Sequence, residues 1–183
     1  RYPEVELELN SNEGIIDLLE RRTDVAFRIG VLKDSTLHAR PVGISRIRVL
    51  ASPAYLKRHG MPASPTQLAQ HSLLGFTEPE SLSEWPLRDA DGNAVRIRPD
   101  IASSSGETLR QMALAGLGIV CLSDFMTRAD REQGNLVQLF GKQTLDICQP
   151  VNAVYYRNTA LAARITCFVD HVVETLGSRP FGT

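Results

Sequence analysis

The residues best suited to hold a ligand form a short polar run, Ser103–Gly106, between two apolar segments. Three serine hydroxyls and the unpaired backbone N–H groups of a helix start can hold a carboxylate or another anion. Ser104 and Glu107 have the S-x-x-E spacing of a capping box, in which both side chains accept backbone N–H groups. These serines could therefore cap a helix only, which needs no ligand, or cap it and bind as well.

The polar run belongs to a predicted strand–helix–strand unit over residues 100–124. Apolar residues recur at helical spacing after the serines, and Gly116 or Gly118 can take the positive φ that ends a helix. Residues 119–122 form a continuous apolar run that is typical of a buried strand. In an open α/β sheet, ligands usually bind at the turn that follows the carboxyl end of a strand.

A second unit of this kind is predicted over residues 5–30. Alternating apolar residues at 5–9 predict a half-buried strand, Asn10 and Glu13 have capping spacing, and residues 24–30 predict a buried strand. The two units, each with a polar turn at its helix start, predict two α/β lobes that face each other.

The remaining elements follow from periodicity and turn chemistry. They are a loop and strand over 31–50 (its strand at 44–50), a helix at 53–59, a helical turn at 66–70, a strand at 72–76, a hairpin around 91–93, a helix at 124–131, a strand near 136–139, a strand at 151–156 and an amphipathic helix at 159–176.

Catalytic and metal-binding patterns were sought and are not present. Gly116-Leu117-Gly118 lacks the third glycine of a dinucleotide fingerprint, and no G-x-S-x-G, H-E-x-x-H or P-loop motif occurs. The four histidines stand apart, and only His38 falls in a predicted cleft loop, where a structural role is the commoner one. The sequence therefore predicts no enzyme, no cofactor and no metal.

Composition narrows the class of protein further. The chain has 183 residues, 43% hydrophobic and 22% charged, with a net charge of −1, which suits one domain or two small lobes. A net charge near zero argues against DNA binding by this chain alone. No run approaches the length of a membrane span, and residues 1–4 do not resemble a signal peptide. The three cysteines, odd in number and widely spaced, predict buried, reduced thiols in a cytoplasmic protein.

Five stretches occur in an order that resembles the effector-binding domain of LysR-type transcriptional regulators. They are RYPEV at 1–5, DVAFRIG at 24–30, LHARP at 37–41, ASPAYL at 51–56 and AGLGI at 115–119. Each stretch is short, but their combined spacing is specific and covers nearly the whole chain.

The resemblance implies two Rossmann-like lobes, similar to type 2 periplasmic binding proteins and joined by two crossover strands. Lobe I would comprise 1–50 with 157–183, lobe II would comprise 51–156, and the effector would lie in the cleft between them. The family's winged helix-turn-helix, its linker helix and the first strand and helix of lobe I are expected to lie outside this chain.

The resemblance also implies a set of effector contacts, which includes the serine turn found from its chemistry. These are Asn10, Ser11, Arg28, Gly30, Thr77, Ser103, Ser104, Ser105 and Gly106. Serine hydroxyls would hold a carboxylate, and Arg28 would be its charge partner or, equally, part of an ordinary salt bridge.

The expected protein is thus a cytoplasmic regulator that senses a small, anionic metabolite and signals to an N-terminal DNA-binding domain. The family pairs its domains side by side, so a homodimer or homotetramer is expected. A solute-binding protein of a transport system, which shares the fold, is the alternative.

Overall fold

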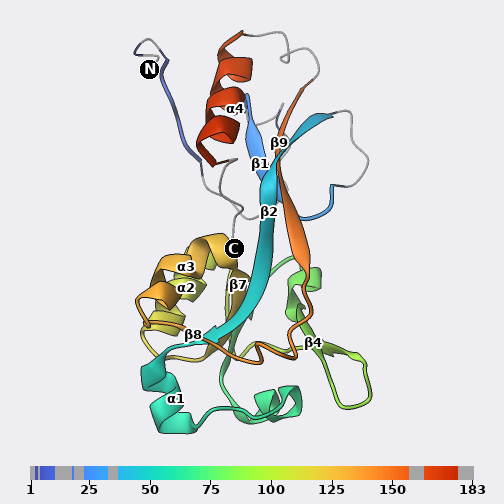
Figure 1. The fold of residues 1–183 in the computed structure, drawn as a ribbon, viewed down its shortest axis with the longest axis vertical. Helices are drawn as coiled ribbons and strands as arrows, with labels where there is room; N and C mark the ends of the chain where they lie inside the picture. The colour runs from blue at the N-terminus through green and yellow to red at the C-terminus, as the bar shows by residue number, and fades with distance from the viewer. Residues whose placement is uncertain are drawn as a thin grey trace. The chain divides into compact units, whose positions relative to one another are not determined.

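The computed structural model describes residues 3, 5–10, 18, 23–32, 37–156 and 163–176. The chain divides into two compact units. Unit 1 contains the described residues up to Ser45 and from Gln149 onward, and unit 2 is Arg46–Cys148. Strands β2 (Leu37–Ala51) and β9 (Cys148–Tyr156) have residues in both units (Figure 1). The resemblance places the division after residues 50 and 156, which stays a prediction.

Unit 2 is built on a mixed sheet, which confirms the predicted α/β class. Its strand order is β2-β7-β3-β6, with β8 also paired to β2. Strand β3 is parallel to both β6 and β7, whereas β2 is antiparallel to β7. The bounds are Leu73–Phe76 for β3, Ile101–Ser103 for β6, Ile119–Ser123 for β7 and Val137–Gln138 for β8.

Both faces of this sheet are covered by apolar side chains. Consecutive residues of β3 and β7 point to opposite faces, so Leu73 and Ile119 enter one buried cluster while Leu74 and Val120 enter the other. Burial on both faces explains why these strands are continuous apolar runs. Each fully buried Leu or Ile contributes about 1.5–3 kcal/mol relative to exposure.

One face is covered by the helix α2 (Gly106–Leu114) and the other by shorter elements. Leu109 and Ala113 of α2 are completely buried in the cluster that contains Leu74. The opposite cluster receives Tyr55 from α1 (Pro53–His59), Leu68 from the 3-10 helix η1 (Pro65–Gln70), and Trp85 and Leu87 from β4 (Glu84–Arg88).

Helix α1 was predicted at 53–59 and is confirmed at those residues. Ser52 is its N-cap and accepts a hydrogen bond from the N–H of Tyr55 at 3.3 Å, while Pro53 occupies the first turn. Proline is favoured there because its missing N–H would be unpaired in any case.

The predicted hairpin is confirmed as β4 and β5 (Ala94–Arg96), which pair antiparallel after the 3-10 helix η2 (Glu80–Ser83). Asp89 holds its turn by accepting hydrogen bonds from the N–H groups of Asp91 and Asn93. These bonds, chiefly that of Asn93, lower the pKa of the Asp89 carboxyl. Trp85 of β4 is 2% exposed and belongs to the buried apolar cluster that contains Tyr55.

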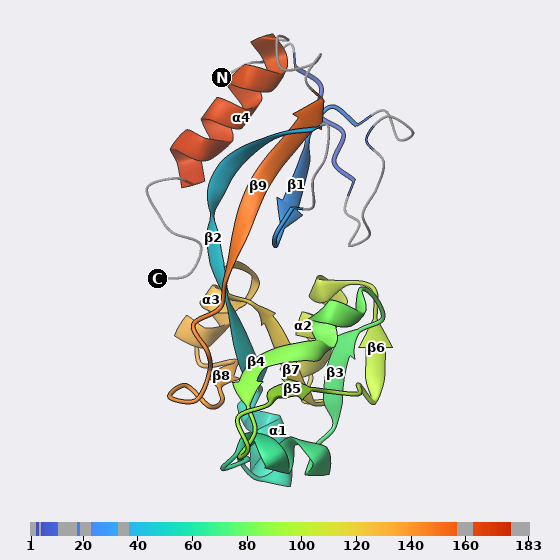
Figure 2. The ribbon, with the colours of Figure 1, turned by 90° about the vertical axis from the view of Figure 1, so that its right-hand side faces the viewer.

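Unit 1 contains β1 (Ala26–Ile29), which pairs antiparallel with β9, and β9 neighbours β2. Helix α4 (Ala163–Leu176) lies against these strands (Figure 2), with Ile165 and Val169 buried on Val42 and Ala153. The strand predicted at 24–30 is confirmed as β1, but its predicted burial is wrong, since Phe27 and Ile29 are 43% and 47% exposed. The helix predicted at 159–176 is confirmed from Ala163 onward.

The strand predicted at 5–9 is wrong. Residues 5–10 have no regular secondary structure, and Val5, Leu7 and Leu9 are 48%, 68% and 85% exposed. Alternation predicts a strand only where a partner strand pairs with the segment, and no strand in the described part of the chain does so. The helix predicted after Asn10 falls outside the described residues, apart from the buried Leu18.

The loop predicted before residue 44 is wrong from Leu37 onward. Strand β2 begins at Leu37, so His38 lies in a strand rather than a cleft loop, with its ring 6.0 Å from that of Tyr155. Pairing with neighbouring strands outweighs the local break that Pro41 suggests. In the described residues, no helix is long and apolar enough to cross a membrane.

The hydroxyl of Tyr55 makes polar contacts with two neighbouring residues, Ser72 and His71. It accepts a hydrogen bond from the N–H of Ser72 at 2.9 Å and lies 3.1 Å from Nδ1 of His71. Desolvation, and then the charge of His59, lower the pKa of His71. This hydroxyl and Nδ1 share a hydrogen bond whose donor depends on the imidazole tautomer.

We expect acidification from about pH 7.5 to 5.5 to lower the free energy of unfolding through His71. The pKa of His71 is lower in the folded chain, so the unfolded chain takes up the proton first, and the loss continues until folded His71 is protonated. Urea unfolding of the wild type and His71→Gln should give a flatter pH dependence for the variant. His171→Gln, at an exposed position of α4, should retain the wild-type dependence. Equal slopes for His71→Gln and the wild type would contradict this assignment.

Candidate functional site

The carboxyl ends of three parallel strands meet at one edge of the unit 2 sheet. Phe76 of β3 stands opposite Ser103 at the end of β6, and the N–H of Thr77 donates to the carbonyl of Ser103 at 3.1 Å. Leu74 stands opposite Val120 of β7, so continuing this register places Ser123 level with Thr77. Thr77 and the serine turn therefore lie together at the carboxyl ends of the strands, which is where ligands usually bind in open α/β sheets.

The serine turn is held by its own hydroxyls. Ser103 Oγ accepts a hydrogen bond from the N–H of Ser105 at 3.1 Å. Ser105 is the N-cap of α2, and its Oγ accepts from the N–H of Thr108 at 3.3 Å. The turn thus directs the start of α2, with the positive end of its dipole, to the strand edge.

The predicted capping box of Ser104 and Glu107 is wrong. The cap lies one residue later, at Ser105, and Glu107 accepts hydrogen bonds from Arg110 and Gln111, both at 2.8 Å, instead of a backbone N–H. Only Ser104 has a glutamate three residues later, so the spacing alone selects the wrong serine. The strand end decides where the helix begins, because Ser103 is paired to β3 and its hydroxyl accepts the N–H of Ser105, the residue that caps α2.

Two hydroxyls at this edge have no hydrogen bond within the described part of the chain, those of Thr77 and Ser104, and both residues are exposed. Ser105 is half-buried and engaged in its cap, and Gly106 is buried. Thr77 and Ser104 are therefore the side chains of this edge that can turn to a ligand.

The other predicted contacts belong to unit 1. Arg28 lies on β1 opposite Asn152 and is half-buried, and Gly30 follows the strand with φ +99°, its N–H donating to the carbonyl of Pro150 at 2.8 Å. Asn10 is exposed, and Ser11 lies outside the described residues. The binding role of all nine residues stays a prediction.

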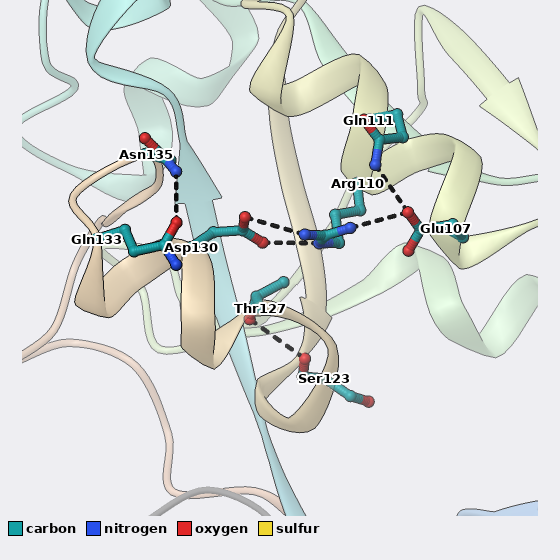
Figure 3. A network of polar contacts seen from close by, with 8 residues as sticks. All are labelled: Glu107, Arg110, Gln111, Ser123, Thr127, Asp130, Gln133 and Asn135. Carbon is teal, nitrogen blue, oxygen red and sulfur yellow. Dashed lines mark hydrogen bonds and ion pairs between the residues drawn. The ribbon is translucent and has the colours of Figure 1, made fainter.

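An ion pair that sequence reasoning missed holds α2 in place. The Arg110 guanidinium bonds both oxygens of Asp130, with Nε to Oδ2 at 2.6 Å and the second bond at 2.9 Å, and it also donates to Glu107 (Figure 3). Hydrogen bonding to Asp130 raises the pKa of Arg110 above its usual value. The i, i+3 spacing of Glu107 and Arg110 is a sequence signal for their ion pair. No sequence signal predicts that Arg110 pairs with Asp130.

Asp130 lies on α3 (Asp124–Glu132), which confirms the helix predicted at 124–131. The completely buried Asp124 begins this helix and forms ion pairs with Arg48 of β2, at 3.4 Å, and with Arg131. Ser123, the residue before it, is a further member of the strand edge that sequence reasoning did not select.

The groups at this edge can form hydrogen bonds. Hydroxyls and a helix start offer hydrogen-bond donors, and no group of three or more metal-ligating side chains occurs in the described ranges. All three cysteines are free; desolvation raises the pKa of the Cys121 thiol, which keeps it protonated and a poor nucleophile. The prediction of buried thiols is wrong for Cys148, which is exposed, and holds only in part for Cys121 and Cys167, which are half-buried.

A separate depression of about 290 Å³ lies beside β2 in unit 2. The Arg46 guanidinium in its wall bonds Asp146 at 2.6 Å, and this bond raises the pKa of Arg46. The lining contains none of the predicted site residues; it consists of Arg46, Ile47, Arg48, Gly141, Thr144, Leu145 and Asp146.

Comparisons with known proteins identify relatives across the chain. A family model described as the LysR substrate binding domain matches residues 1–177. The HTH-type transcriptional regulator CrgA of Neisseria meningitidis serogroup B is 50% identical over 182 residues, covering 100% of this chain and 61% of CrgA. An uncharacterised HTH-type transcriptional regulator of Haemophilus influenzae is 32% identical over 170 residues, covering 91% and 58%. The chain thus spans about three fifths of the length of these relatives.

Solved structures share its fold. The CrgA regulatory domain from Neisseria meningitidis, described as a LysR-type transcriptional regulator, has a TM-score of 0.91 at 50% identity, covering 96% of this chain and 86% of that one. The full-length Vibrio cholerae virulence activator AphB has a TM-score of 0.78 at 30% identity, covering 95% and 59%.

The revised cap position can be tested with neighbouring serines. Ser105→Ala removes the acceptor for the Thr108 N–H and should lower the free energy of unfolding by about 1 kcal/mol. Ser104→Ala, at an exposed residue that does not cap the helix, should change it by less than about 0.5 kcal/mol. Chemical denaturation measures both variants. A larger loss for Ser104→Ala than for Ser105→Ala would restore the capping box predicted from sequence.

Proposed function

The chain belongs to the LysR substrate-binding domain family and is the effector-binding regulatory domain of a LysR-type regulator; on this premise we propose that it binds a small anionic effector at the strand edge of unit 2. The observation that supports this proposal is the pair of unbonded, exposed hydroxyls, on Thr77 and Ser104, beside the start of α2. The helix dipole favours an anion there by about 0.3–1 kcal/mol.

Family resemblance alone supports the contacts proposed in unit 1. Arg28 would supply the positive charge for a carboxylate, in a charge-assisted hydrogen bond about twice as strong as a neutral one. Asn10, Ser11 and Gly30 would supply further polar contacts. In unit 2 the hydroxyls of Thr77 and Ser104 would act with the backbone of Ser103–Gly106.

The effector site can be tested by titrating the chain with a panel of small mono- and dicarboxylates and following thermal unfolding. A carboxylate at about 100 times its dissociation constant should add about 2.7 kcal/mol of stability. Thr77→Val and Ser104→Ala should each weaken its binding by about tenfold, because each removes a hydrogen bond to a charged group.

Ser81→Ala, at an exposed serine of the 3-10 helix η2, is the matched control and should bind as tightly as the wild type. Unchanged affinity in a site variant removes that residue from the site. If no carboxylate stabilises the wild type, the proposal of an anionic effector fails.

We also propose that the complete gene product is a cytoplasmic, homodimeric or homotetrameric DNA-binding transcription factor that acts through an N-terminal domain outside this chain. Support comes from the relatives, which are longer and are named as HTH-type transcriptional regulators. Their names favour neither an enzyme nor a solute-binding protein of a transport system.

DNA binding should separate the complete gene product from this 183-residue chain. In a gel shift with DNA from upstream of its own gene, the complete product should bind, and binding should weaken as salt rises, because phosphate contacts release counterions. The chain alone, with a net charge of −1, should give no shift. A complete product that never shifts this DNA would count against the proposed regulator, and a shift by the chain alone would show that the DNA contacts lie within it.

A further inference from the structure

Helix α3 is held in unit 2 by polar groups rather than by an apolar stripe. Its buried residues are Asp124, Thr127 and Asp130, which recur every third position and are 0%, 0% and 5% exposed. Its phenylalanine, Phe125, is 39% exposed, and no α3 residue enters the buried apolar clusters of unit 2. Helices at a protein surface usually bury an apolar face, so this arrangement is unusual.

Each buried polar residue of α3 has at least one partner, although Oδ2 of Asp124 makes no hydrogen bond within the described residues. Asp130 bonds Arg110 of α2 in bidentate geometry, the hydroxyl of Thr127 donates to the carbonyl of Ser123 at 3.3 Å, and Asp124 pairs with Arg48 of β2 (Figure 3 for the first two). A bidentate guanidinium–carboxylate pair has a specific geometry, because two parallel hydrogen bonds fix both groups. If α2 shifts, α3 must follow or the pair must break, which would leave a buried carboxylate without its partner.

Helix α2 carries the serine turn at its first residue, and Arg110 follows Gly106 by about one helical turn. A series of direct contacts therefore leads from the turn through Arg110 and Asp130 to α3, and from α3 through Asp124 and Arg48 to β2. Strand β2 contributes residues to both units.

We propose that Arg110 and Asp130 form a positioning pair that couples the Ser103–Gly106 turn to α3, so that an effector that orders the turn also orders α3. The ligand part of this proposal rests on the proposed function of the turn. The coupling itself does not depend on a ligand, because it arises from contacts within the chain. It is reciprocal: a change that orders α3 also orders the turn, because both effects share one coupling free energy.

The coupling can be measured without a ligand by following hydrogen exchange at the backbone amides of α3. Ser105→Ala loosens the start of α2 by removing its cap. In the wild-type background it should speed exchange in α3 by at least about twofold, the lower end of the coupling between residues of one network. In the Arg110→Met background, the same Ser105→Ala change should leave α3 exchange unaltered, because the connection is already lost.

Arg96→Met is the matched control, since Arg96 pairs at 2.8 Å with exposed Glu80 in the hairpin region and touches neither helix. With Arg96→Met present, Ser105→Ala should still speed exchange in α3. Asp130→Asn removes the charge from the other partner and should behave as Arg110→Met does, which gives a second test if Arg110→Met does not fold.

The proposed coupling is overturned if Ser105→Ala speeds hydrogen exchange in α3 equally with and without the pair. It is also overturned if Ser105→Ala does not speed this exchange in either background. The result is independent of the carboxylate titration. If no carboxylate stabilises the chain but the effect of Ser105→Ala on α3 exchange depends on the pair, only the effector proposal fails. If a carboxylate binds but the effect on α3 exchange does not depend on the pair, only the positioning pair fails.

Discussion

The burial of both faces of the unit 2 sheet is the constraint on which the rest of this unit depends. Leu73 and Leu74 of β3, and Ile119 and Val120 of β7, enter opposite apolar clusters and leave neither strand a solvated face. Parallel strands buried in this way end together, so the turns that follow them gather at one edge. The polar residues at this edge thus owe their proximity to the apolar residues buried on the two faces of the sheet.

The two helices connected to this edge are held by different kinds of contact. Helix α2 lies on the sheet through Leu109 and Ala113, whose burial is favourable but not directional. Helix α3 turns Asp124 and Asp130 inward and depends on ion pairs whose geometry is specific. If α2 shifts, its ion pair with α3 must shift with it or break, and this geometric requirement is the basis of the proposed coupling.

Several elements could be predicted from local chemistry, and the failures share one cause. Ser52-Pro53 and the Asp91-Gly92 turn determined α1 and the hairpin because capping and turn geometry need no distant partner. The alternation at 5–9 and the S-x-x-E pattern at Ser104 were misleading, because a strand needs a neighbour and a cap needs the helix to begin at that residue. His38 was misplaced for the same reason: cross-strand pairing extended β2 beyond its local pattern.

The sequence by itself determined the family, the α/β class and the location of the serine turn, because motif order, apolar periodicity and turn chemistry are properties of neighbouring residues. Tertiary structure decided that Thr77 lies beside Ser103, that Ser105 caps α2, and that Arg110 meets Asp130 across 20 residues of chain. Such contacts depend on strand order and helix packing, which bring together segments whose local patterns are independent of one another.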